Sequence, residues 1–217
     1  VAEEKNLPDQ EEQSLSELLQ IRRDKLTDLQ NAGEDPFQVT KYPVTHHSAE
    51  IKEEFEGLEG QIVSVAGRLM SKRGMGKAVF SDLQDGKGRI QLYVRIDELG
   101  EEPFAKFKKL DIGDIVGVKG FVFRTNMGEI SVHAKELVML SKSLRPLPIV
   151  KEKDGKVFDA FTDPELRYRQ RYLDLIVNPQ VKDVFIKRTK MINAIRQFYT
   201  EMGCLEVETP VLQAIPG

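Results

Sequence analysis

Hydrophobic residues along residues 61–140 fall in five short stretches that read as β-strands, and in the second and third stretches they alternate with polar residues at the period of two that is typical of half-buried strands. The stretches begin at Ile62, Lys77, Gly88, Asp114 and Glu129, and turns that contain glycine separate them. Between the third and fourth stretches, the segment PFAKFKKL predicts a short helix. The pattern therefore predicts five strands with one helix after the third.

This order of elements is that of an OB-fold barrel, whose usual cargo is an oligonucleotide laid across the second and third strands. The alternation in the third strand places aliphatic residues on one face and polar residues on the other. The inward set is Ile90, Leu92, Val94 and Ile96, and the outward set is Arg89, Gln91, Tyr93 and Arg95. In the second strand Val79 and Leu83 point inward, which turns Phe80 outward.

An outward Phe80 beside an outward Gln91 suits the binding of single-stranded nucleic acid. The ring stacks on a base, the amide reads a Watson–Crick edge, and nearby cations meet phosphate. The first turn, SKRGMGK, contributes Lys72, Arg73 and Lys77 but lacks the spacing of a P-loop, so we interpret it as a basic hairpin tip beside the stacking face. The alternative is that Phe80 packs beneath a neighbouring helix or loop.

The N-terminal flank combines an acidic segment with a helix. Residues 1–13 are acidic and polar, which predicts a mobile tail. Ser14 and Glu17 have the spacing of a capping box, and they predict a helix that opens an N-terminal helical extension over residues 14–60. Arg22 and Arg23 lie opposite its leucine stripe, either as a solvated face or as contacts to the backbone phosphate of an RNA bound by the barrel.

The C-terminal flank reads as a linker and the start of a second domain. Prolines in residues 141–163 predict a semi-rigid linker, and residues 164–217 begin the second domain. Asp163-Pro164 and Asn178-Pro179 each predict a helix start, the second helix running from about Pro179 to Met202 with one apolar stripe. The segment LEVETP then predicts a short strand that stops at Pro210. The fold class is α+β.

Composition narrows the function classes. With 32 basic and 35 acidic residues, the chain has no global basic field, so an RNA site must be local. The single cysteine, Cys204, excludes an internal disulfide and fits a reducing cytoplasm, and three histidines make a poor metal set. No segment reads as a membrane span or a signal peptide, and no hydrolase, zinc-protease or Walker motif is present. We expect an RNA-binding barrel without metal or membrane contact.

Longer runs carry a more specific resemblance. From IRRDKL at Ile21 to Gly217 the chain resembles the bacterial lysyl-tRNA synthetases, most specifically in RYRQRYLDL and EVETPVLQ. The second run resembles motif 1 of class II aminoacyl-tRNA synthetases, in which a long helix leads into a strand that ends in proline. The aspartyl and asparaginyl enzymes share the barrel and motif 1, and the run SLRPLP before RYRQRYLDL favours the lysine enzymes.

The resemblance implies roles for individual residues. The barrel would bind the U-rich anticodon of the lysine tRNA, with Phe80 as the stacking aromatic and Gln91 as the hydrogen-bond partner of the central uridine. Arg73 and Glu129 match positions that contact the flanking anticodon bases. Motif 1 would build a homodimer interface that includes Glu208 and Pro210, and Gly217 matches a glycine whose backbone approaches the lysine substrate.

A whole enzyme of this family would be a lysine–tRNA ligase that uses ATP and Mg²⁺ to join lysine to AMP and then transfers the lysyl group to tRNA. Motifs 2 and 3 of the family lie beyond residue 217, so the resemblance places no catalytic residue, ATP site or metal site in this portion. The alternative is a non-enzymatic OB-fold module that binds tRNA or single strands.

We expect these 217 residues to bind tRNA but to form no lysyl-adenylate, because adenylation depends on positioned cations of the missing motifs. Pyrophosphate exchange above background with this chain alone would contradict the expectation.

Overall fold

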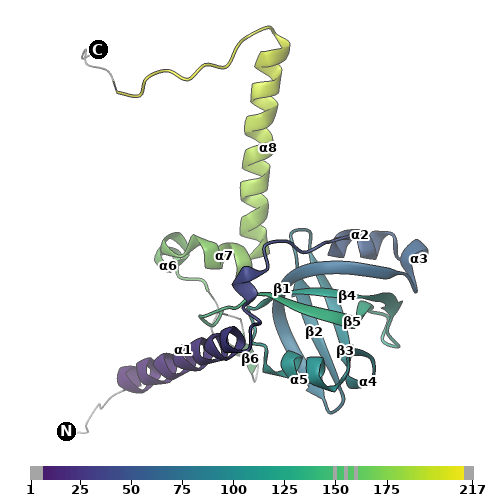
Figure 1. Ribbon diagram of the computed structural model, residues 1–217. Helices are drawn as coiled ribbons and strands as arrows, with labels where there is room; N and C mark the ends of the chain where they lie inside the picture. Colours follow the sequence, from purple (N-terminus) through teal and green to yellow (C-terminus); the bar gives the residue numbers. More distant parts are fainter. Residues whose placement is uncertain (1–6, 149–150, 154–155, 159–160, 213–217) are drawn as a thin grey trace, which may run out of the picture. The chain divides into compact units, whose positions relative to one another are not determined.

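The computed structural model describes residues 7–148, 151–153, 156–158 and 161–212 (Figure 1). The chain divides into two compact units, with the boundary after Pro146, inside the predicted linker. The first unit contains a barrel and the long helix α1, and the second contains three helices and a small hairpin.

The barrel has the predicted five strands and is closed in the order β1-β2-β3-β5-β4. The strands are β1 (Ile62–Met75), β2 (Ala78–Gln84), β3 (Arg89–Arg95), β4 (Ile115–Arg124) and β5 (Ile130–Ser141). Antiparallel pairs form most of the barrel, and a short parallel pairing between β3 and β5 closes it. Two short helices, α4 (Ile96–Leu99) and α5 (Glu101–Lys109), stand where one helix was predicted. Ile96 thus begins α4 instead of continuing the inward row of β3.

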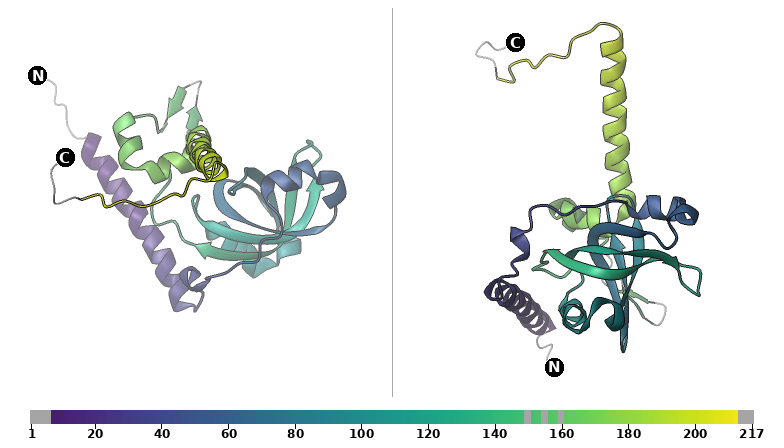
Figure 2. Two further views of the ribbon diagram at one scale, coloured as in Figure 1. Left: turned by 90° about the horizontal axis from the view of Figure 1, so that it is seen from above. Right: turned by 45° about the vertical axis from the view of Figure 1, so that its right-hand side comes forward.

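Aliphatic side chains from every strand fill the barrel, among them Val65, Leu92 and Val118, all buried. Helix α5 adds Phe104 and Phe107, whose spacing of three puts both on the face toward this core. The helices α2 (Ser48–Glu53) and α3 (Phe55–Leu58) add further apolar side chains to the same cluster. The views in Figures 1 and 2 place α2 and α3 on the opposite side of the barrel from α5.

Helix α1 (Leu7–Asn31) begins earlier than the predicted start at Ser14. The mobile-tail prediction is therefore wrong for residues 7–13, while residues 1–6 lie outside the described part. Pro8 suits the first turn of a helix, and the glutamates and glutamines that follow are good helix formers, so nothing delays helix formation until Ser14. The helix ends as predicted before Gly33, whose φ of 73° needs the freedom of glycine.

A buried ion cluster joins β5 to the loop before β4. The ammonium of Lys142 lies 2.8 Å from Oδ1 of Asp114 and 2.6 Å from Oδ2 of Asp111, and the Lys142 and Asp114 side chains are 2% and 0% exposed. Lys25 of α1 reaches the other oxygen of Asp111 at 2.7 Å. Burial raises the pKa of Asp111, but hydrogen bonds from Lys142 and Lys25 outweigh it, so that pKa lies below its usual value.

The second unit confirms both helix starts predicted from Asx-Pro pairs. Its helices are α6 (Pro164–Arg169), α7 (Arg171–Val177) and α8 (Pro179–Glu201). The Asp163 carboxylate accepts a hydrogen bond of 2.8 Å from the backbone N–H of Leu166, which caps α6. The buried Asp174 accepts hydrogen bonds from Arg167, Arg171 and Asn178, and so ties α6 and α7 to the start of α8.

The predicted linker contains a hairpin that was not predicted, in which β6 (Lys151–Lys153) pairs antiparallel with β7 (Lys156–Phe158). The sequence signal for it is an Asp-Gly pair between two short segments. The strand predicted before Pro210 is not formed, because a strand needs a hydrogen-bonding neighbour and nothing in the described chain pairs with residues 204–210.

Replacement of Lys142 with alanine should lower the free energy of unfolding by about 3–5 kcal/mol, because it leaves the fully buried Asp114 carboxylate without its cation. Urea unfolding at neutral pH measures this. The control is Lys119→Ala, which breaks an exposed pair with Glu136 and should cost about 0–1 kcal/mol. Equal losses in the two variants would contradict the assigned role of the cluster.

Candidate nucleic-acid interface

The pairing register gathers the predicted site residues on one outer wall of the barrel. Phe80 of β2 lies opposite Tyr93 of β3, and the next outward pair is Asp82 and Gln91. Arg73 of β1 lies opposite Phe80 on its other side. In β2 and β3 the alternate residues are buried in the core while these positions are partly exposed, so the predicted outward direction of Phe80 and Gln91 is confirmed.

Rings continue across this wall as an aromatic platform of Phe80, Tyr93, Phe121, Phe123 and His133. Phe80 and Tyr93 stack with ring centroids 4.7 Å apart and planes at 27°. Tyr93 in turn lies 4.9 Å from His133, and His133 lies 4.7 Å from Phe121. Phe121, Phe123 and His133 were not predicted as part of this wall. The alternation of β4 signals Phe121 and Phe123, but their place beside Tyr93 follows from the barrel closure.

His133 is the polar member of the aromatic platform and is almost fully buried. Its Nε2 has no hydrogen-bond partner in the described part of the chain. Burial lowers the pKa of His133, and the cations Arg95 and Lys135 lower it further, against an opposing effect of Glu98. The ring is therefore neutral near pH 7 and packs against the rings of Tyr93 and Phe121.

Gln91 stands between two polar neighbours on the adjacent strands. The Ser131 hydroxyl of β5 donates a hydrogen bond of 3.0 Å to Gln91 Oε1. On the other side is Asp82, whose carboxylate accepts a hydrogen bond from Ser71 and lies 3.5 Å from the Arg73 guanidinium. No acceptor for Gln91 Nε2 is found among the described residues, so its N–H groups are open to a ligand beside the Phe80 ring.

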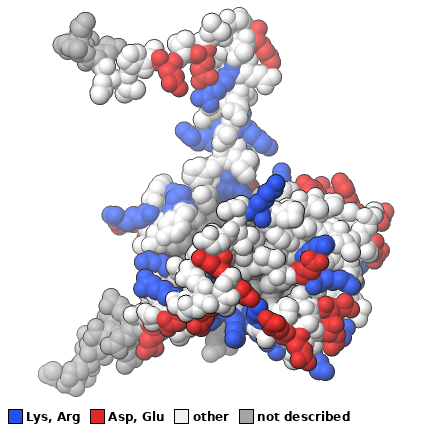
Figure 3. All heavy atoms as spheres, in the orientation of Figure 1, with Lys and Arg blue, Asp and Glu red and all other residues white. Residues whose placement is uncertain are grey.

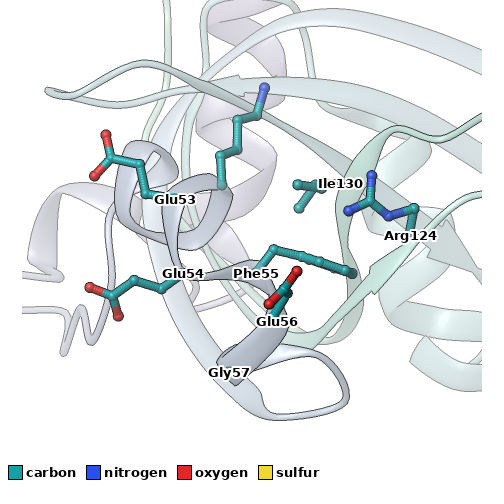
Figure 4. Close-up of a pocket in the computed structure, with 8 residues that line it drawn as sticks. Glu53, Glu54, Phe55, Glu56, Gly57, Arg124 and Ile130 are labelled. Carbon is teal, nitrogen blue, oxygen red and sulfur yellow. The ribbon is translucent and has the colours of Figure 1, made fainter.

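The two flanking candidates are exposed. The Arg73 side chain is 64% exposed, and Glu129 is half exposed in the turn between β4 and β5, with Lys52 of α2 3.4 Å away. Beside this turn lies an open groove of about 410 Å³, lined by residues of α2, α3, β4 and β5. Figure 4 shows its wall, where the Arg124 guanidinium lies 4.4 Å from the centroid of the Phe55 ring. Glu129 therefore sits at the rim of a polar groove and not on the aromatic platform.

The four cations predicted to meet tRNA phosphate divide into two kinds. Lys77 and Arg23 are exposed, and within the described ranges neither side chain has a partner. Lys72 instead donates to the carbonyls of Phe107, Lys108 and Leu110, at the C-terminal end of α5. The three ammonium protons of Lys72 therefore have acceptors within the chain, and burial lowers the pKa of Lys72. The structure gives Lys72 the role of a helix cap and not of a phosphate ligand.

The Arg22 side chain also makes its hydrogen bonds within the chain. Its guanidinium donates to the carbonyls of Ser143, Arg145 and Ile112 at 2.9–3.2 Å, which fastens α1 to the barrel. The prediction that Arg22 meets tRNA backbone is therefore not supported.

Surface charge is mixed on the face drawn in Figure 3, where acidic and basic side chains intermingle over the barrel. Within the described residues, no three histidine, cysteine, aspartate or glutamate side chains come together as a metal site. None of the described helices has the length and apolar character needed to cross a membrane. What the wall does present is the local arrangement of the rings, the Gln91 amide and Arg73.

Motif 1 is only partly described. Glu208 and Pro210 are exposed in the segment after α8, and Gly217 lies outside the described residues. The structure therefore leaves the predicted roles of all three as predictions.

Comparisons with known proteins match both units. Residues 63–140 match the family of OB-fold nucleic acid binding domains. Residues 163–217 match the class II tRNA synthetases (D, K and N). The chain is 56% identical over 212 residues to a lysine–tRNA ligase of Porphyromonas gingivalis strain W83, a match that covers 94% of this chain. It is 53% identical over 215 residues, 99% of this chain, to a lysine–tRNA ligase of Clostridium perfringens.

Over most of its length the chain is similar to the N-terminal portion of lysyl-tRNA synthetases. It spans 37% of the length of the Porphyromonas relative and 41% of the length of the Clostridium relative. The matched portion combines the OB-fold barrel with the beginning of the class II domain, as the resemblance of RYRQRYLDL and EVETPVLQ implied.

Lys72 and Lys77 of the barrel should respond differently to substitution. Lys72→Met should cost about 1–3 kcal/mol of unfolding free energy, because the C-terminal carbonyls of α5 lose a charged donor. Lys77→Met, on the exposed turn, should change stability by less than about 0.5 kcal/mol. Urea denaturation of both variants checks the difference, and a Lys72→Met protein as stable as the parent would contradict the capping role.

Proposed function

We propose that this chain is part of a lysine–tRNA ligase and that its barrel binds the anticodon of the lysine tRNA. The observation that carries the proposal is the outer wall of β2 and β3, where a partly exposed aromatic ring adjoins an amide with open N–H groups. The name of the relatives, lysine–tRNA ligase, supports the choice of tRNA.

The chemistry of this wall suits unpaired uridines. A base stacks on Phe80, whose far side is already supported by Tyr93, so the ring is held in place before binding. The open amide of Gln91 then meets the Watson–Crick edge of that base or its neighbour. Arg73 and Glu129 are our candidates for contacts to the flanking bases, and Lys77 and Arg23 for contacts to phosphate.

The ligase reaction itself requires ATP, and we propose that the whole enzyme also uses Mg²⁺. The described residues hold no carboxylate cluster suited to the metal, so we assign neither group to a residue of this chain. The contribution of this portion is recognition of tRNA and of a second subunit.

We also propose that motif 1 forms a homodimer interface, with Glu208 and Pro210 in it. Helix α8 supports this, because many of its large apolar side chains are exposed: Val184, Phe185, Ile186, Met191, Ile195, Phe198 and Tyr199. The segment beyond it exposes four more aliphatic residues up to Leu212. Exposed apolar area of this extent marks a surface that another protein surface covers.

The anticodon proposal predicts a base preference. The chain should bind a stem-loop with the anticodon UUU more tightly than the same stem-loop with CCC, at a fixed salt concentration. Backbone contacts alone would hold both equally, and equal affinities would favour the alternative, a single-strand-binding module without tRNA preference.

Phe80→Ala should weaken binding of the UUU stem-loop by about 1–3 kcal/mol through loss of one stack, and should leave the barrel folded because the ring lies on the outer wall. Fluorescence anisotropy gives the affinity and circular dichroism the fold. The matched control is Phe37→Ala, a half-exposed ring remote in sequence from the barrel strands, which should leave affinity unchanged. Unfolding of the Phe80 variant, or equal losses in both, would argue against the stack.

A further inference from the structure

We propose that Ser131 and Asp82 are positioning residues that fix the orientation of the Gln91 amide, so that it presents N–H donors alone and selects uracil over cytosine. The inference rests on the proposed anticodon function and names the basis of its base selectivity. The three side chains form one row across β2, β3 and β5.

The first part of the row is the buried Ser131. Its side chain is 0% exposed, and its hydroxyl lies 3.0 Å from Gln91 Oε1 and 3.3 Å from the carbonyl oxygen of Glu129. A hydroxyl has one proton to donate, and the shorter contact is the one to Gln91. The parallel pairing of β3 with β5 holds the two residues side by side, so this contact is built into the closure of the barrel.

The second part is the Asp82 carboxylate on the opposite flank. It is a direct cross-strand partner of Gln91, and such partners have Cβ atoms about 4.5–5.5 Å apart. An ionised carboxylate only accepts hydrogen bonds, so it disfavours an amide oxygen turned toward it. With a donor on one side and a negative charge on the other, the amide has one favourable orientation: oxygen toward β5 and nitrogen toward β2 or the ligand.

This orientation determines which base fits. Uracil offers carbonyl acceptors at both ends of its Watson–Crick edge, and these accept from the open Gln91 N–H groups. Cytosine carries an amino group in place of one of these carbonyls, so a fixed amide donor meets another donor there. If the amide could turn over, its oxygen would accept from cytosine and the selectivity would be lost. The selectivity thus depends on neighbours that need not touch the RNA.

The test compares stem-loops with anticodons UUU and UCU, which differ at the central base, on the full 217-residue chain. Ser131→Ala should lower the ratio of the two affinities about five- to tenfold, the worth of one hydrogen bond, mainly by improving binding of UCU. Asp82→Asn should lower it in the same direction, because an asparagine N–H can donate to a reversed Gln91 amide. Asp82 is partly exposed, so this variant keeps the test valid should the buried Ser131→Ala protein fail to fold.

Two further variants distinguish an effect that acts through Gln91 from a merely structural effect. In a Gln91→Ala background neither substitution should change the ratio any more, whereas a merely structural effect would persist there. Ser71→Ala, which removes a neighbour of Asp82 in the same row, is the matched control and should leave the ratio within about twofold of the parent.

The proposal is overturned if Gln91→Ala lowers the ratio but folded Ser131→Ala and Asp82→Asn proteins keep it. A parent chain that shows no preference between the two loops would instead sink the anticodon function itself.

Discussion

A three-residue parallel pairing holds the candidate interface together. Gln91, Leu92 and Tyr93 of β3 pair with Ser131, Val132 and His133 of β5, and this contact closes the barrel. The middle pair, Leu92 with Val132, is buried in the core. The outer pairs bring the Ser131 hydroxyl to the amide and His133 to the Tyr93 ring. Burial of Leu92 and Val132 in the core holds the two strands in this register. The register in turn sets the positions of the polar and aromatic side chains on the outer face.

The cations also divide into those that hold the fold together and those that are exposed. Lys25, Lys72, Lys142 and Arg22 face carbonyls or carboxylates of this chain and hold α1, α5 and β5 in place. Arg73 and Lys77 remain in solvent near the aromatic platform. The overall charge of the chain is balanced, and most cations near this wall are paired within the chain. Any basic site there is therefore small and rests on the exposed side chains.

Features that depend on residues close together in the sequence could be predicted from the sequence. Strand alternation gave the outward direction of Phe80 and Gln91, and Asx-Pro pairs gave the starts of α6 and α8. The capping pattern at Ser14 misled, because α1 extends through residues with good helix propensity. Ser131, His133 and the roles of Lys72 and Arg22 were missed for a different reason. Each depends on a group that is distant in sequence and that only the closed barrel brings near.

One irregularity in β5 has a consequence for how the two ends of that strand can change. Its pairing with β4 shifts between Lys119 and Gly120, so that Lys119 pairs with Glu136 and Gly120 with Ala134, and Lys135 is an extra residue. Val132 and Ala134 point inward before this bulge, and Leu137 packs against the core after it. Deletion of Lys135 would remove the bulge and shift one half of the strand by one residue. In that half, the side chains that now point inward would point outward. The bulge therefore separates the half of β5 that carries Ser131 and His133 from the half that leads to the buried Lys142, and it lets both halves turn their apolar side chains toward the core.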